Sequence, residues 1–109
     1  MQSDKYSLRY LPIFYDDLNE AVSYIANTLQ NKQAAMALLN SVEKAILERL
    51  PFAEAFEQYH SVKERKYAYY RIYVKNFIVF YVVINDECVK PIMEVRRLLY
   101  NKSDYKKFI

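Results

Sequence analysis

The sequence contains no glycine and no tryptophan, and it has a single cysteine and a single histidine. Without glycine, the chain cannot form the glycine-rich loop that cradles phosphates in many nucleotide-binding proteins. Cys88 has no second thiol for an internal disulfide, and neither Cys88 nor His60 has a partner at the spacing of a metal site. We therefore expect no metal and no cofactor, a buried Cys88 and an exposed His60.

Length and charge limit the protein further. The 109 residues, 53% of them hydrophobic, predict one domain spanning residues 1–109 with a core of its own. The first residues lack the apolar centre of a signal peptide, and no apolar run is long enough to span a membrane. We therefore expect a cytoplasmic protein that does not enter a membrane. The net charge of +3 indicates an anionic partner only if the cations cluster.

The second half of the chain contains three stretches with the pattern of antiparallel strands. In the first, alternation places Tyr69, Arg71 and Tyr73 on one face and mainly apolar side chains on the other. The second is apolar on both faces, which is typical of a central strand. Short turns, with asparagine or aspartate to accept a positive φ, join them into a three-stranded meander. The strands are expected at residues 67–75, 77–84 and 88–99, with turns at 75–76 and 85–87.

The first half of the chain predicts a short strand followed by two helices. Asp17, with Glu20 three residues later, resembles a capping box, and Asn31 is expected to cap the second helix. Pro12 ends the strand and suits an edge position, and Pro51 ends the second helix. The strand is expected at residues 6–12 and the helices at 17–30 and 32–50, joined as an antiparallel hairpin.

Two remaining segments are less regular. Residues 52–64 are expected to form a loop or helical turn, with Phe52 and Phe56 packed under the sheet, and residues 101–109 a short helix capped by Ser103. The order of elements is typical of an α+β fold with two layers. We expect an N-terminal strand that pairs beside the last strand, an antiparallel helical hairpin over one face, a three-stranded antiparallel meander and a short C-terminal helix.

The sheet face away from the helices is expected to carry cations interleaved with tyrosines. Arg71 and Arg97 fall on this face, where guanidinium groups suit a phosphate and tyrosine rings suit the bases of single-stranded RNA. The alternative is a solvated cationic face balanced by Glu54, Glu57 and Glu64. The cations considered are Lys63, Arg65, Lys66, Arg71, Lys75, Arg96, Arg97 and Lys102.

Two segments give the chain a resemblance to a known family. Residues 76–81 read NFIVFY, and residues 97–104 read RLLYNKSD. Together with the order of helices and strands, they resemble the RelE/ParE superfamily, in which one strand opens with a form of Asn-Tyr-Arg-Ile-Phe-Tyr and the last reads Arg-Val-Leu-(His/Tyr)-x-x-Arg-Asp. The resemblance covers nearly the whole chain and implies the fold described above.

The resemblance also implies an activity. Members of this superfamily are toxins of bacterial type II toxin–antitoxin modules, and each is held inactive by a cognate antitoxin. RelE-like members are metal-independent endoribonucleases that cut mRNA on the ribosome. On this basis Arg71 and Arg97 are expected to hold the scissile phosphate and Tyr100 to transfer a proton. The lysines expected to contact the RNA are Lys63, Lys66, Lys75 and Lys102.

Alternatives remain open within the same resemblance. ParE-like members inhibit DNA gyrase without cutting RNA, and here residues 105–109 are a plausible contact for gyrase. A third possibility is an inactive member that only binds its antitoxin through the helical hairpin and a groove beside the sheet. Ile78 stands where the family has an arginine, and Leu99 where some nucleases have a histidine. Because Arg71, Arg97 and Tyr100 are all present, a nuclease is the first prediction.

Overall fold

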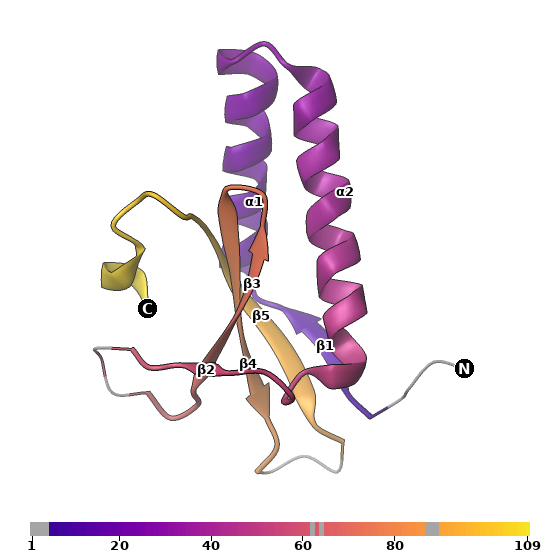
Figure 1. Ribbon diagram of the computed structural model, residues 1–109, viewed down its shortest axis with the longest axis vertical. Helices are drawn as coiled ribbons and strands as arrows, with labels where there is room; N and C mark the ends of the chain where they lie inside the picture. Colours follow the sequence, from indigo (N-terminus) through magenta and orange to yellow (C-terminus); the bar gives the residue numbers. More distant parts are fainter. Residues whose placement is uncertain (1–4, 62, 64, 87–89) are drawn as a thin grey trace.

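A mixed sheet of five strands forms one layer of the molecule, in the order β1-β5-β4-β3-β2 (Figure 1). β1 runs parallel to β5, and all other neighbouring strands are antiparallel. The computed structural model describes residues 5–61, 63, 65–86 and 90–109. The strands are β1 (Ser7–Tyr10), β2 (Gln58–Tyr59), β3 (Tyr69–Val74), β4 (Phe77–Ile84) and β5 (Ile92–Tyr100).

The predicted meander is present as β3, β4 and β5, and β1 lies beside β5 as expected. In the turn between β3 and β4, it is Lys75 that takes the left-handed conformation, with φ of 54°. β5 begins at Ile92 and not at the predicted residue 88, since Pro91 has no N–H to join a ladder of hydrogen bonds. The predicted start at Cys88 lies outside the described residues. β2 was not predicted; it pairs with the first residues of β3.

Two long helices form the second layer. They are α1 (Pro12–Ser23), which continues into a π-helical turn (Tyr24–Thr28), and α2 (Lys32–Arg49). The cap at Asn31 is confirmed, because its side chain accepts a hydrogen bond from the Ala34 N–H at 3.0 Å. In the described ranges, neither helix has the length and apolar character needed to cross a membrane.

The predicted start of the first helix at Asp17 is wrong. The helix begins five residues earlier, at Pro12, and Leu11 occupies the cap position without a side-chain hydrogen bond. Proline suits the first turn because its fixed φ is helical and the N–H that it lacks would have no partner there. Asp17 therefore lies inside the helix, where its carboxylate is available for another contact.

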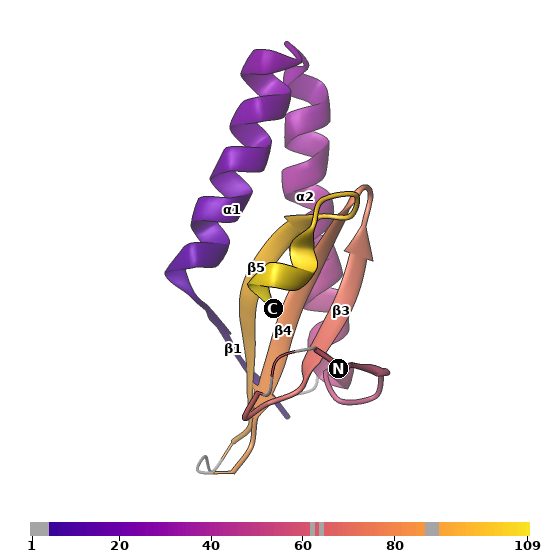
Figure 2. The same cartoon turned by 90° about the vertical axis from the view of Figure 1, so that its left-hand side faces the viewer.

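The helical hairpin covers one face of the sheet and extends past its edge (Figures 1 and 2). Between the layers lies a continuous core to which both helices and all three meander strands contribute. The expectation for β4 is confirmed, since its central residues are fully buried on both faces. The fully buried members of β4 are Ile78, Val79, Phe80, Tyr81 and Val82.

The other face of the sheet, called the outer face below, is partly covered by the C-terminal segment (Figure 2). Ile109 and Tyr105 pack against a second core that includes Ile78, Phe80 and Leu99. The predicted C-terminal helix over 101–109 is reduced to one 3₁₀ turn, Tyr105–Phe108. The hydroxyl of Ser103 donates to the Tyr100 carbonyl at 2.7 Å and so forms a turn after β5 instead of capping a helix.

The segment after α2 differs from the prediction. A 3₁₀ turn (Leu50–Phe52) follows the helix, and Phe52 is 60% exposed instead of packed under the sheet. Phe56 is exposed too, and one side of its ring lies against the Arg49 guanidinium at 3.5 Å. Ala53 takes the buried position, and its carbonyl accepts a hydrogen bond from the Tyr81 hydroxyl at 2.7 Å. A buried tyrosine needs such a partner, and a larger residue than alanine would hold this segment away from β4.

Candidate functional site

A β-bulge in β5 directs two successive arginines to the outer face. Val95 pairs with Tyr81, whereas Arg97 pairs with Phe80, so Arg96 is an extra residue in β5. Val95 belongs to the core under the helices. The Arg97 guanidinium lies 5.1 Å from the Phe108 ring, and that of Arg96 lies 6.0 Å from the Tyr69 ring. Both arginine side chains therefore leave β5 on the outer face.

Arg71 and Arg97 lie in one row across the sheet, as expected. Phe80 of β4 pairs with Arg71 on one side and with Arg97 on the other. Residues paired in this way project from the same face of a sheet. The two predicted phosphate-binding arginines thus share the outer face, with the fully buried ring of Phe80 between them.

Arg71 lies among aromatic rings at the exposed end of this row. Its guanidinium is 4.9 Å from the ring centre of Tyr59 and 5.9 Å from that of Tyr73. Its ion pair with Glu57 is 3.6 Å long, and the Glu57 side chain is 87% exposed. Such an exposed pair contributes little and is readily exchanged for another anion. Arg71 is therefore a cation placed between rings and accessible to a ligand.

Arg97 is engaged within the protein. Its Nε and Nη2 donate to the two oxygens of Asp17 at 2.8 and 3.0 Å, and the backbone N–H of Leu98 donates to the same carboxylate at 3.0 Å. The side chains of Arg97 and Asp17 are only 16% and 14% exposed. The hydrogen bond that Arg97 donates to Asp17 raises the pKa of Arg97, so the guanidinium stays charged. Asp17 thus joins α1 to the edge of β5. Its carboxylate neutralises the charge of Arg97, which was predicted to bind the phosphate.

Tyr100 does not join the two arginines. It pairs with Phe77, which packs against the core under the helices, and the two rings are 5.6 Å apart. Positions three apart on a strand point to opposite faces, so Tyr100 lies on the face away from Arg97. The structure therefore places Tyr100, the predicted proton-transfer residue, across the sheet from both arginines.

The predicted RNA-contacting lysines are dispersed. Lys63 donates to the Lys107 carbonyl at 2.9 Å and holds the C-terminal segment. Lys66 pairs with Asp86 at 3.6 Å, near the turn between β4 and β5. Lys75 is in the opposite turn, and Lys102 follows the end of β5. The backbone hydrogen bond of 2.8 Å from Asn101 to Asn76 brings these two lysines to the same end of the sheet.

One cluster on the outer face was missed by the sequence analysis. Glu94 is the only buried charged residue in the described part of the chain. The Nε of Arg9 donates to its Oε2 at 2.8 Å, with a second bond from Nη2, and the Nε of Arg96 donates to its Oε1 at 2.8 Å. Arg9 and Glu94 are 85 residues apart but face each other across the parallel β1–β5 pair. No local pattern indicates such a contact.

This cluster predicts a specific loss of stability in acid. Burial would raise the pKa of Glu94, but the hydrogen bonds from Arg9 and Arg96 outweigh it and lower the pKa below its usual value of 4.5. A carboxyl group with a lowered pKa contributes stability above its unfolded-state pKa and loses it as the pH falls through the folded-state value. We expect Glu94→Gln to be less stable than the native protein at neutral pH, and the difference to shrink below about pH 4.5. Urea unfolding of both proteins across this range measures it, and a difference independent of pH would contradict the assignment.

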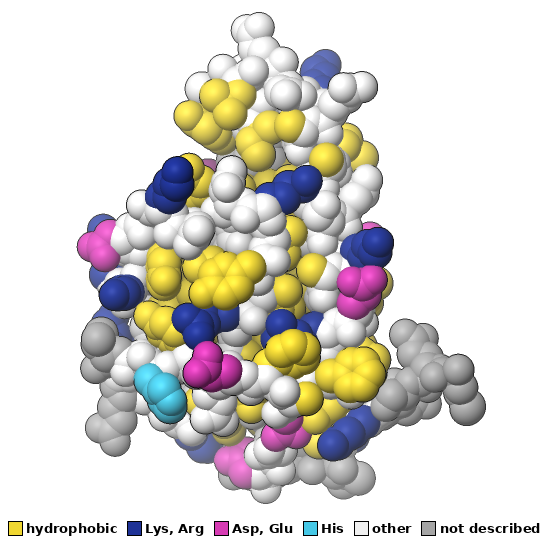
Figure 3. All heavy atoms as spheres, viewed as in Figure 1, with side chains coloured by type: hydrophobic (Ala, Val, Ile, Leu, Met, Phe, Trp, Pro, Cys, Tyr) yellow, Lys and Arg dark blue, Asp and Glu magenta, His cyan; other side chains and the backbone are white. Residues whose placement is uncertain are grey.

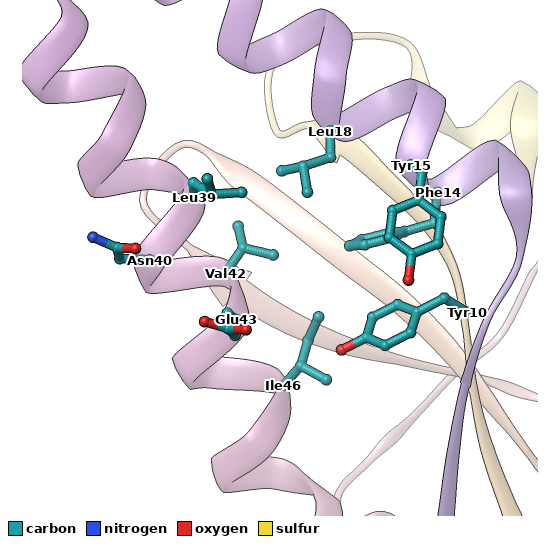
Figure 4. A pocket seen from close by; sticks show the side chains of 9 residues that line it. All are labelled: Tyr10, Phe14, Tyr15, Leu18, Leu39, Asn40, Val42, Glu43 and Ile46. Atoms are coloured by element: carbon teal, nitrogen blue, oxygen red, sulfur yellow. The ribbon is translucent and has the colours of Figure 1, made fainter.

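A groove lies between α1 and α2, with a volume of about 330 Å³ (Figure 4). Its walls are mainly apolar side chains of both helices, such as Leu18, Leu39 and Ile46. Tyr10 and Glu43 add polar groups at its margin; burial, together with Tyr15 and Glu43, raises the pKa of Tyr10. An apolar groove with few polar groups suits the side chains of a peptide better than it suits acid–base chemistry.

The comparisons with known proteins do not assign the chain to a family. Neither the models of known protein families nor the curated proteins include a match. In the ranges that the structure describes, no group of three His, Cys, Asp or Glu side chains could hold a metal ion. His60 is exposed, as expected, and Cys88 lies outside the described residues.

Proposed function

We propose that the protein is a toxin of the RelE/ParE type that acts on RNA. The observation that carries the proposal is the pairing of its two motif segments. Residues 76–81 and 97–104 meet on the neighbouring strands β4 and β5, with Phe77 opposite Tyr100 and Phe80 opposite Arg97. The first strand, the helical hairpin and the meander also follow one another in the order that the resemblance implies. An α+β fold alone would not support an activity, so the support for one must come from the residues of the site.

Arg71 is the residue best placed to contact RNA. Its side chain is partly exposed and lies near the ring of Tyr73, which is 60% exposed. A guanidinium group beside an exposed ring can bind a phosphate while the ring stacks on the adjacent base. In a cleavage reaction the same cation would stabilise the charge that develops on the phosphate. Tyr100 lies on the opposite face, so the geometry favours Arg71 over Tyr100 as the residue on which activity depends.

The proposed nuclease activity is tested by measuring cleavage of a reporter mRNA in a translation reaction. We expect the native protein to generate new translation-dependent 5′ ends and Arg71→Ala to lower the cleavage rate about 100-fold, which is typical for loss of a charge-stabilising group. Tyr100→Phe, which removes only the hydroxyl, is expected to retain activity. Lys44→Ala on the exposed side of α2 controls for the loss of one positive charge. Unchanged cleavage by Arg71→Ala would remove Arg71 from the site.

A specific observation favours a second candidate, an inhibitor of DNA gyrase that cuts no RNA. Arg97 is already paired with Asp17, and Tyr100 is on the other face, so the nuclease set expected from the resemblance is not assembled. Supercoiling by purified gyrase, measured with the same preparations, distinguishes the two. Inhibited supercoiling with intact mRNA supports the inhibitor, and expression without growth arrest supports an inactive member that only binds its antitoxin.

A cognate antitoxin is the partner in each of these cases. The groove between α1 and α2 offers the apolar surface that an amphipathic helix requires (Figure 4). Glu43 at its margin would favour a helix with a cation beside its apolar stripe. In this proposal the protein acts in the cytoplasm, where ribosomes and gyrase are found, and binds no membrane.

A further inference from the structure

We propose that Arg9 and Arg96 form a second RNA-binding site, which holds a phosphate of single-stranded RNA and is positioned by Glu94. The inference rests on the proposed function in one respect, that the target is RNA, and it does not require the RNA to be cut. The site is centred on the β1–β5 pair, where the two guanidinium groups meet at one buried carboxylate. It uses Arg96, the residue before Arg97, but it is centred on β1 and β5 and not on the row formed by Arg71 and Arg97.

The two arginines keep hydrogen-bond donors that no described residue accepts. Within the described part of the chain, Arg9 gives Glu94 its Nε and one terminal nitrogen, and Arg96 gives it only its Nε. A guanidinium group carries further N–H donors at its terminal nitrogens, in a planar fork that matches phosphate oxygens. The side chains of Arg9 and Arg96 are 51% and 24% exposed, so these donors are accessible from solvent.

Glu94 orients the cations without cancelling their charge. Its side chain is 5% exposed, so a ligand on the surface would meet the guanidinium groups and not the carboxylate. Two guanidinium groups against one carboxylate leave a net positive charge at this site. Arg65 approaches the ring of Tyr69 at 5.7 Å, the same ring that Arg96 approaches at 6.0 Å, and its Nε donates to the Ile109 carbonyl at 3.3 Å. Fixed arginines lose less side-chain entropy when they bind, which favours an anion at this place.

The surroundings indicate single-stranded RNA as the source of the phosphate. Tyr59, Tyr67 and Tyr73 lie on the outer face with partly or largely exposed rings, and Tyr59 and Tyr73 flank Arg71 there. A single strand whose phosphate is held by Arg9 and Arg96 would reach these rings as it crosses the outer face. Figure 3, viewed as in Figure 1, shows Lys and Arg side chains between hydrophobic ones on the side of the molecule formed by β3 and α2. Rings of this kind stack on unpaired bases, whereas a duplex keeps its bases stacked inside. A free phosphate ion would contact only the arginines and would make no use of the tyrosine rings.

The test is the binding of a short, fluorescently labelled oligouridylate, measured by anisotropy over a range of salt concentrations. We expect Arg9→Ala and Arg96→Ala each to weaken binding about tenfold, as the loss of hydrogen bonds to a charged group predicts. Each should also lower the slope of log affinity against log salt by about 0.7, the value for one phosphate contact with a single strand. Arg96→Lys, which keeps the charge but not the fork, is expected to lie between Arg96→Ala and the native protein.

Controls separate a binding site from a structural ion pair. Lys44→Ala removes one positive charge from the other layer and is expected to bind as the native protein does. Circular dichroism and urea unfolding establish that each variant is folded at the assay temperature. If Arg96→Ala does not fold, the test rests on Arg9→Ala, which changes a largely exposed side chain. Native affinity in a folded Arg9→Ala or Arg96→Ala would overturn the proposal, as would the absence of oligouridylate binding by the native protein at low salt. If the native protein binds oligouridylate but cuts no mRNA, the result counts against the proposed nuclease activity and not against this binding site.

Discussion

Alanine in place of Phe80 is expected to lower the free energy of unfolding by about 3–5 kcal/mol, the usual cost of removing a buried aromatic ring. Phe80 is fully buried, and three tyrosine rings lie around it. Tyr59, Tyr69 and Tyr105 have ring centres 5.7, 5.9 and 5.6 Å away, so the substitution leaves a cavity between the sheet and the C-terminal segment. Urea unfolding followed by circular dichroism measures the change.

Phe52→Ala is the matched control for this prediction. The Phe52 side chain is largely exposed, and its loss is expected to change stability by no more than about 0.5 kcal/mol. The pair also tests the correction to the sequence analysis, in which Phe52 was placed under the sheet. Equal losses in the two variants would mean that the segment after α2 packs differently from the arrangement described here.

Asp17→Ala is the second substitution for which we expect a large effect, a loss of about 3 kcal/mol in the free energy of unfolding. Removal of the carboxylate leaves the mostly buried Arg97 without a counter-charge and the Leu98 N–H without a partner. An unpaired charge in such a place costs more than the ion pair itself contributes. The measurement is again urea unfolding, at neutral pH and moderate salt.

Asp16 provides the comparison for Asp17. It is the preceding residue, has the same charge and is exposed, so Asp16→Ala is expected to change stability by less than about 0.5 kcal/mol. If the two substitutions cost the same, the contact from α1 to β5 contributes no stability. Asp17→Asn, which keeps an oxygen for the Leu98 N–H but not the charge, should fall between them.

The strands and helices follow closely from the sequence because local patterns determine them. Alternation in β3 and the apolar run of β4 each imply a face and a depth of burial without reference to distant residues. Asn31 and Pro51 mark the ends of α2 through chemistry confined to one turn. The position of β1 beside β5 was also predicted, since a helical hairpin can return the chain to that edge; its parallel direction was not.

The contacts within the site depend on pairings that no local pattern contains. A capping pattern and an ion pair across the fold both use aspartate, and Asp17 was assigned to the first when the structure uses it for the second. Glu94 meets Arg9 only because the two strands take one particular register. The position of Tyr100, by contrast, could have been predicted: it lies three positions after Arg97, and simple alternation already places the two on opposite faces.

The bulge in β5 has the largest effect on the candidate site, and it could not be predicted. With regular alternation after Val95, Arg96 would face outward and Arg97 would face the helices. The extra residue directs both to the outer face, which is why Arg97 shares a row with Arg71. The prediction for Arg97 was therefore correct for its face, but the reason is an irregularity that the sequence does not reveal.

The parallel pairing of β1 with β5 also has a consequence for folding during synthesis. β1 leaves the ribosome before both helices and the other strands, yet its partner comprises residues 92–95. The helical hairpin is local and can form early, but the sheet that covers its apolar side is incomplete until β5 emerges. During that interval the nascent chain exposes hydrophobic surface and an unpaired strand edge, so chaperones would have their longest opportunity to bind it then. A protein that closes its sheet with its first strand thus becomes competent for any activity only after β5 has emerged.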